Sequence, residues 1–206
     1  MLKAFFDTEK LSVKLGMLFS HVGLSPNTWT VLAIIPAILG FLSLVMYHNL
    51  FWALLFFMAS GVIDAIDGAV ARVTTRVSAM GAFLDGVIDR YVEFLLYMGL
   101  LFFLMAGGPE FIVPNYVWIN ILLFGAIMPT FIRAYADHRK VVTDPRDLRR
   151  MGGLLERAER LTLLYIGLLL GMYDVLWLVY IVAAAAILAN FTAFQRLWFV
   201  FRYRAE

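Results

Sequence analysis

The chain consists largely of apolar stretches that are long enough to cross a bilayer. Of its 206 residues, 63% are hydrophobic, whereas a soluble domain is about 45–50% apolar. A membrane-spanning helix needs about 20 apolar residues. We therefore expect an all-α, polytopic membrane protein in which residues 1–206 form a single domain. Its six predicted transmembrane helices are residues 28–47, 50–72, 79–105, 115–138, 154–173 and 175–200.

The segment before the first span predicts a short amphipathic helix. Within residues 4–19, apolar side chains such as Leu15 would lie in the membrane interface, with Lys14 directed towards water. The alternative is a frayed leader, because chain termini are commonly loosely ordered. Ser25 and Pro26 favour the start of the first span, as N-cap and first helical residue.

The basic residues lie on one side of the predicted membrane. The N-terminus, the loops 73–78 and 139–153 and the C-terminus share one face, and all 17 Lys and Arg residues lie there or in a span that reaches it. The loops on the opposite face, 48–49, 106–114 and 172–174, have none. Cytoplasmic loops are enriched in Lys and Arg. We therefore expect a plasma-membrane protein with both termini in the cytoplasm.

Four carboxylates interrupt the second and third spans at fixed intervals. Asp64 and Asp67 are three residues apart, and Asp85 and Asp89 are four apart, so each pair shares a helix face. The turn at 73–78 makes the two helices antiparallel neighbours, so all four carboxylates can converge in the cytoplasmic half of the membrane. Such groups are costly in lipid and usually functional. Oxygen ligands of this kind suit one or two divalent cations, in a site open to the cytoplasm.

Two other interpretations of these carboxylates remain. Structural ion pairs with Arg72, Arg76 and Arg90 would leave the charge unbalanced. A cation transporter or channel would need acidic residues spread along a pore, whereas these four carboxylates are predicted to lie at one depth in the membrane. In a metal site that binds phosphate, Arg72 would bind the phosphate through charge-assisted hydrogen bonds. Gly68 and Gly81 would leave room for a ligand or a neighbouring backbone.

The run Asp64-x2-Asp67-Gly68-x2-Ala71-Arg72-x8-Gly81-x3-Asp85-x3-Asp89 resembles the signature of the CDP-alcohol phosphotransferase family. The resemblance implies that an alcohol displaces CMP from a CDP-activated lipid. It implies that the four aspartates bind one or two Mg²⁺ or Mn²⁺ ions, that Asp89 is the general base, and that the protein is a homodimer. The residues expected at the CDP group are Asn27, Asp67, Gly68, Ala71, Arg72, Ser78, Gly81 and Asp85, although Asn27 and Ser78 are alternatively helix caps.

Arginines outside the signature predict an acceptor that carries phosphate. Arg133 lies near the cytoplasmic end of the fourth span, Arg157 and Arg160 begin the fifth, and Arg196 lies within the sixth. Together they form a predicted basic pocket, in which the helix N-terminus before Arg157 also attracts anions. The alternative is that these side chains only extend to the membrane surface.

Two segments resemble the phosphatidylinositol-phosphate synthase branch of the family. Residues 153–161 are similar to its G-L-x-E-R-x-E-R-L segment, and residues 130–137 to its S-Y-x-K/R-A-x-A-E segment. The resemblance implies that the four arginines bind inositol 1-phosphate, with CDP-diacylglycerol or CDP-archaeol as the lipid donor. The alternative acceptor is glycerol 3-phosphate, which would make the protein a phosphatidylglycerol-phosphate synthase.

Overall fold

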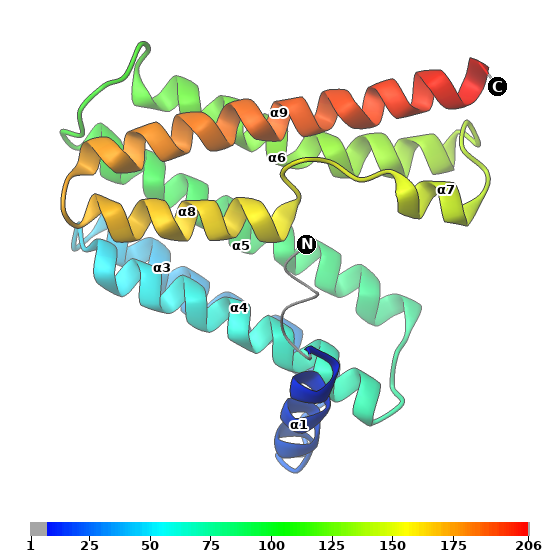
Figure 1. Cartoon of the computed structure of the whole chain (residues 1–206). Helices are drawn as coiled ribbons and strands as arrows, with labels where there is room; N and C mark the ends of the chain where they lie inside the picture. Colours follow the sequence, from blue (N-terminus) through cyan, green and yellow to red (C-terminus); the bar gives the residue numbers. More distant parts are fainter. Residues whose placement is uncertain (1–7, 206) are drawn as a thin grey trace. The chain divides into compact units, whose positions relative to one another are not determined.

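The computed structural model describes residues 8–205, and every regular element within them is an α-helix (Figure 1). The all-α class expected from the sequence is confirmed. The first four residues of the predicted N-terminal helix, 4–7, lie outside the described part. The helices are α1 (Thr8–Ser20), α2 (Pro26–Leu32), α3 (Ile34–Val45), α4 (Leu50–Val73), α5 (Ala79–Met105), α6 (Asn115–His138), α7 (Pro145–Arg150), α8 (Arg157–Gly171) and α9 (Val175–Ala205).

Within residues 8–205, four helical segments are long and apolar enough to cross a membrane, as in a multi-pass membrane protein. They are Pro26–Val45, Leu50–Val73, Asn115–His138 and Val175–Tyr203. The two other predicted spans fall short for different reasons. α5 has 27 residues but carries four charged side chains, those of Asp85, Asp89, Arg90 and Glu93, and α8 is apolar but has only 15 residues.

The helix ends agree closely with the sequence pattern, except in the first and fifth spans and at the end of α9, which extends five residues beyond the predicted residue 200. α5 and α6 have the predicted bounds, and α4 ends one residue later than expected. The first span is divided at Ala33 into α2 and α3. Pro36 explains this break, because proline has no N–H for the carbonyl of Leu32 and its ring crowds that carbonyl. At the break, the Ala33 carbonyl accepts a hydrogen bond from Ser60 Oγ of α4 at 2.7 Å.

The fifth span also begins later than predicted, at Arg157 rather than at residue 154. The N–H groups of Leu154 and Leu155 are used elsewhere. They donate to Gln195 Oε1 at 2.9 Å and to Thr192 Oγ1 at 2.8 Å, both on α9. The segment is therefore held as a loop.

The chain divides between Gly99 and Leu100 into two compact units, which are described separately. In the first, α1, α2 and α3 all pack against α4. Phe57 of α4 is fully buried and fills the space left by Gly40 on α3, where a Cβ would lie only 2.8 Å from the Phe57 ring. This close packing fixes α4, the helix that carries half of the carboxylates.

In the second unit, α9 runs alongside α6 and also packs against α8 (Figure 1). Small residues allow the close approach, including the buried Ala186 and Ala189 on α9. Asn190 Nδ2 donates to the carbonyl of Ile121 at 2.8 Å. A Cβ on Gly125 would lie 2.5 Å from that same nitrogen, so α6 needs glycine there. The pair α6 and α9 carries two of the predicted arginines.

Candidate active site

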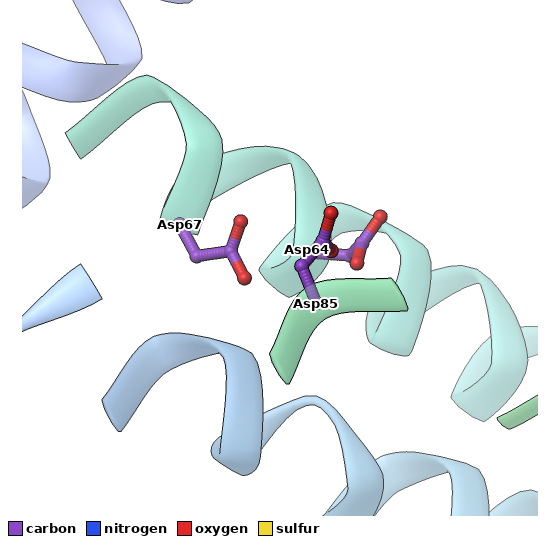
Figure 2. Close-up of side chains that lie close together, drawn as sticks. All are labelled: Asp64, Asp67 and Asp85. Atoms are coloured by element: carbon purple, nitrogen blue, oxygen red, sulfur yellow. The ribbon is translucent and has the colours of Figure 1, made fainter. Parts of the chain in front are cut away.

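Three of the four predicted metal ligands come together between α4 and α5. Figure 2 shows Asp64 and Asp67 on α4 and Asp85 on α5. One carboxylate oxygen from each residue can be chosen so that all three lie within 4.8 Å of one another. We call these three residues the carboxylate cluster. Asp67 is only 7% exposed, and the other two are half-buried.

The cluster fits a divalent cation. Magnesium–oxygen distances are about 2.1 Å, so oxygens on opposite sides of one ion are about 4.2 Å apart. The observed 4.8 Å separation needs only a small side-chain adjustment to reach this spacing. The Oδ2 atom of Asp67 is buried and has no hydrogen-bond partner within residues 8–205. A buried carboxylate oxygen without a partner is costly, and a cation would satisfy it.

Asp89 is placed differently from the other aspartates. It lies one helical turn beyond Asp85 on α5 and is half-buried, but it is not a member of the carboxylate cluster. The structure therefore brings together three of the four carboxylates that the sequence spacing predicted to converge. The roles of Asp89 as metal ligand and as general base stay predictions.

A cavity of about 430 Å³ adjoins the cluster. Its wall comes from the start of α2, the last turns of α4, the loop 74–78 and the start of α5. Ligand sites typically have volumes of about 300–1,000 Å³. All eight residues predicted to bind the CDP group line this cavity: Asn27, Asp67, Gly68, Ala71, Arg72, Ser78, Gly81 and Asp85.

Two polar side chains meet at a glycine in the cavity wall. Ser78 caps α5, because its Oγ accepts the N–H of Gly81 at 3.0 Å. A Cβ on Gly81 would lie 3.1 Å from Ser78 Oγ and 3.2 Å from Asn27 Oδ1. The cap on α2 is Ser25 rather than Asn27, since Ser25 Oγ accepts the N–H of Thr28 at 3.2 Å. Asn27 is therefore available to a ligand, and its contact with the nucleotide stays a prediction.

Arg72 lies in the last turn of α4 and is exposed. Its Nη2 donates to Ser12 Oγ of α1 at 2.7 Å, a contact between residues 60 positions apart. A Cβ on Gly68 would lie 3.4 Å from Arg72 Nη1, which is ordinary van der Waals contact. The guanidinium group thus lies beside Gly68 and retains N–H donors for an anion in the cavity.

Sequence reasoning missed several residues that line the cavity, notably Thr30 and Arg76. Thr30 is three residues after Asn27, so it shares a face of α2 with it, and this spacing was a usable signal. Arg76 is in the turn that joins the two carboxylate-bearing helices. A short turn at that place must lie near the cluster, so its basic residue could have been recognised as a second anion-binding group.

The predicted arginine pocket lies in the second unit. Arg160 and Arg196 are 2% and 8% exposed, so neither extends its side chain to water. Arg196 donates from Nη1 to the carbonyl of Pro129 at 2.8 Å and forms an ion pair with Glu156 at 3.3 Å. The charges of Arg133 and Arg160 are close enough to act on Arg196 electrostatically. These three arginines converge from α6, α8 and α9, and Arg157 begins α8.

Glu156 was not predicted as part of this pocket. It precedes Arg157 as the N-cap residue of α8, and the loop before it is fixed to α9 by Thr192 and Gln195. A Cβ on Gly153 would clash with Thr192, so glycine is needed for the loop to lie so close. The loop therefore places the Glu156 carboxylate against Arg196.

Comparison with known proteins agrees with this geometry. Residues 23–195 match the sequence profile of the CDP-alcohol phosphatidyltransferase family. The archaetidylinositol phosphate synthase of Aeropyrum pernix is 30% identical over 199 residues, which cover 97% of this chain and 94% of that relative.

Solved structures of the phosphatidylinositol phosphate synthase of Mycobacterium tuberculosis are also similar. The form with CDP-DAG bound has a TM-score of 0.77 and 25% identity, covering 93% of this chain and 94% of that one. The complex with manganese and citrate has a TM-score of 0.79 and 25% identity, covering 92% and 88%. The chain therefore belongs to the CDP-alcohol phosphatidyltransferase family and is a transferase of this type.

Proposed function

We propose that this protein transfers the lipid-bearing phosphate of a CDP-activated lipid to inositol 1-phosphate and releases CMP. The observation that carries the proposal is the 430 Å³ cavity, whose wall holds all eight residues expected at the CDP group. Asp67 and Asp85 lie in the same wall, so anion-binding and cation-binding groups adjoin each other. Similarity to archaetidylinositol phosphate synthase along nearly the whole chain supports the choice of acceptor.

The donor in this proposal is CDP-diacylglycerol or CDP-archaeol. Arg72 and Arg76 line the cavity and would bind the diphosphate, while Asn27 and Ser78 would contact the nucleotide. The related Mycobacterium tuberculosis structure with CDP-DAG bound supports the ester-linked donor. The relationship to an archaetidylinositol phosphate synthase supports the ether-linked donor.

The metal site in this proposal consists of Asp64, Asp67 and Asp85, with Asp89 as a further ligand, and holds one or two Mg²⁺ or Mn²⁺ ions. When bound, such an ion neutralises the diphosphate and the departing CMP. The Oδ2 atom of Asp67, for which the described residues offer no hydrogen-bond partner, supports the site. The manganese complex of the related synthase supports the type of ion.

The protein's own residues account for the remaining chemistry. The acceptor hydroxyl oxygen attacks the phosphorus that bears the lipid, and the bond from that phosphorus to the CMP oxygen breaks. Asp89 takes the hydroxyl proton as general base. Arg72 and Arg76 hold phosphate oxygens, and Gly81 leaves space for the nucleotide. Much of the rate would come from holding lipid donor and soluble acceptor in a reactive geometry.

The acceptor phosphate in this proposal is bound by Arg133, Arg160 and Arg196, with Arg157 in support. The burial of Arg160 and Arg196 supports this role, because a desolvated guanidinium binds phosphate more strongly than an exposed one. Inositol 1-phosphate is preferred to glycerol 3-phosphate on the basis of the relatives' activities. A cation transporter or channel is set aside, because the chain belongs to a transferase family.

Replacing Arg196 with glutamine should raise the KM for inositol 1-phosphate by about 10- to 100-fold, the effect of losing a charge-assisted hydrogen bond. The KM for the CDP-lipid should change by less than about twofold, since Arg196 is not among the residues of the CDP cavity. Steady-state kinetics with each substrate varied in turn makes the comparison. Arg202→Gln on the exposed part of α9 is the matched control. Equal losses for both substrates would make Arg196 a structural residue.

The membrane arrangement is part of the same proposal. We infer six spans, with α5 and α8 added to the four apolar segments, and α1 as an interfacial helix. Both termini would lie in the cytoplasm, the active site would open to that side, and the chain would act as a single domain within a homodimer. The family profile extends across both compact units, which supports one functional domain.

A panel of acceptors tests the proposed function. Purified protein in detergent or vesicles receives CDP-diacylglycerol or CDP-archaeol with Mg²⁺ or Mn²⁺, together with inositol 1-phosphate, glycerol 3-phosphate, serine or free inositol. We expect CMP release with inositol 1-phosphate, and none after chelation of the divalent metal. CMP release with glycerol 3-phosphate alone would identify the alternative synthase. Ion flux without CMP release from any acceptor would contradict the whole proposal.

A further inference from the structure

Helix α1 packs directly against the backbone of α4, at the end of α4 that forms the active site. A Cβ on Gly16 would lie 2.5 Å from the carbonyl oxygen of Ala69 and 2.6 Å from Val73 Cγ2. Gly16 is therefore required for α1 to approach so closely. Val13 and Met17, each one residue beyond Ser12 and Gly16, lie off this face and are exposed. The contact between α1 and α4 is thus one-sided and has a defined register.

This register places Ser12 next to Arg72. Ser12 lies one helical turn before Gly16, so both face α4. Its Oγ accepts a hydrogen bond from Arg72 Nη2 at 2.7 Å. Arg72 in turn lines the cavity beside Asp67 and Gly68. Among the described side chains, α1 contributes none to the cavity wall, and this hydrogen bond joins α1 directly to a residue that lines it.

We propose that Ser12 is a positioning residue, which holds the Arg72 guanidinium in the direction needed to bind the diphosphate of the CDP-activated lipid. An exposed arginine has considerable rotamer freedom, and binding an anion requires that this freedom be lost. A hydrogen bond already formed in the ligand-free protein removes part of that cost. Since Arg72 has five N–H donors, the one given to Ser12 leaves the others for phosphate.

This inference rests on the proposed function and concerns only the lipid donor. Ser12→Ala should weaken CDP-lipid binding about fivefold, the usual effect of one net hydrogen bond. The KM for the acceptor should not change. Ser12→Thr, which keeps the hydroxyl, should bind like wild type. Val13→Ala, on the exposed face of α1, is the matched control and should also bind like wild type.

A double-mutant cycle separates positioning from a general effect of α1. The dissociation constant of the CDP-lipid is measured by direct titration for wild type, Ser12→Ala, Arg72→Ala and the double variant. We expect Ser12→Ala to cause no further loss of CDP-lipid affinity when Arg72 is replaced by alanine. The fivefold change in the dissociation constant should then disappear. Additive losses, or a Ser12→Thr variant as weak as Ser12→Ala, would overturn the inference.

Failure of this inference is distinguishable from failure of the proposed function. If wild type binds the CDP-lipid and releases CMP while Ser12→Ala has the same affinity, only the role of Ser12 is wrong. If wild type does not bind the CDP-lipid at all, the proposed function itself is wrong, and Ser12 has no ligand to position.

Discussion

Replacing Asp67 with asparagine should lower CMP release by about a thousandfold or more, because a metal-assisted step loses several kcal/mol of charge stabilisation and each 1.36 kcal/mol is a factor of ten. Asp67 is the most buried member of the carboxylate cluster and also lines the CDP cavity. Its Oδ2 is buried and has no hydrogen-bond partner in the described part of the chain. Asparagine has the same shape, but it carries no charge and offers one oxygen instead of two.

The lower CMP release of Asp67→Asn should arise from weakened cation binding and not from misfolding. Titration of the purified protein with Mn²⁺ measures the site without turnover, and wild type should bind far more tightly than Asp67→Asn. Thermal unfolding gives a second measurement. Mn²⁺ should raise the Tm of wild type but not that of the variant, because only the site in the folded protein binds the ion.

The same substitution should leave the metal-free protein folded and at least as stable as wild type. Three clustered carboxylates repel one another, and removing one charge relieves that repulsion. Asp174→Asn is a suitable control, since Asp174 is exposed and caps α9 through the N–H of Leu176, a role that asparagine fills equally well. If Asp67→Asn kept wild-type Mn²⁺ affinity, the proposed metal site would be wrong.

The length and apolar character of the spans were predictable because they depend on local sequence. α5 and α6 have the predicted bounds, with polar or turn residues on both sides of each. The break at Ala33 was missed, although Pro36 is visible in the sequence. Whether a proline breaks or only bends a membrane helix depends on partners for the freed carbonyl groups. Here Ser60, 27 residues away, donates to the carbonyl of Ala33, which is next to the Leu32 carbonyl that Pro36 frees.

The carboxylate cluster was predictable for a related reason. Spacings of three and four residues set a common helix face, and a short turn sets two helices side by side, so Asp64, Asp67 and Asp85 had to approach each other. The same reasoning placed Asp89 on this face of α5, one turn farther along the helix, and its role as a metal ligand stays a prediction. Residues three or four apart on a helix share a face, but they lie about one turn apart along the helix axis.

Contacts between segments that are distant along the chain could not be predicted from the sequence. Arg196 needs a partner, because a charge within a span is costly. Its partners, Glu156 and the Pro129 carbonyl, are 40 and 67 residues away, and no pattern marks them. The same holds for Ser12 and Arg72. Such pairs follow from helix packing, which depends on the shapes of many side chains at once.

Replacing Asp89 with asparagine should lower turnover by about 10²- to 10⁴-fold, the contribution of a general base. This variant should still bind the CDP-lipid, because Asp89 is not among the described residues that line the CDP cavity. The measurements are kcat for CMP release and the dissociation constant of the CDP-lipid.

The two aspartate variants together separate the base from the metal site. Asp67→Asn should lose Mn²⁺ binding and turnover together. Asp89→Asn should lose turnover while the three residues of the carboxylate cluster keep most of the Mn²⁺ affinity. If Asp89→Asn retained more than about a tenth of wild-type kcat, Asp89 would not be the base, since even a modest base contributes about a hundredfold. If it lost Mn²⁺ binding as completely as Asp67→Asn, its main role would be that of a ligand, and the proton would need another acceptor.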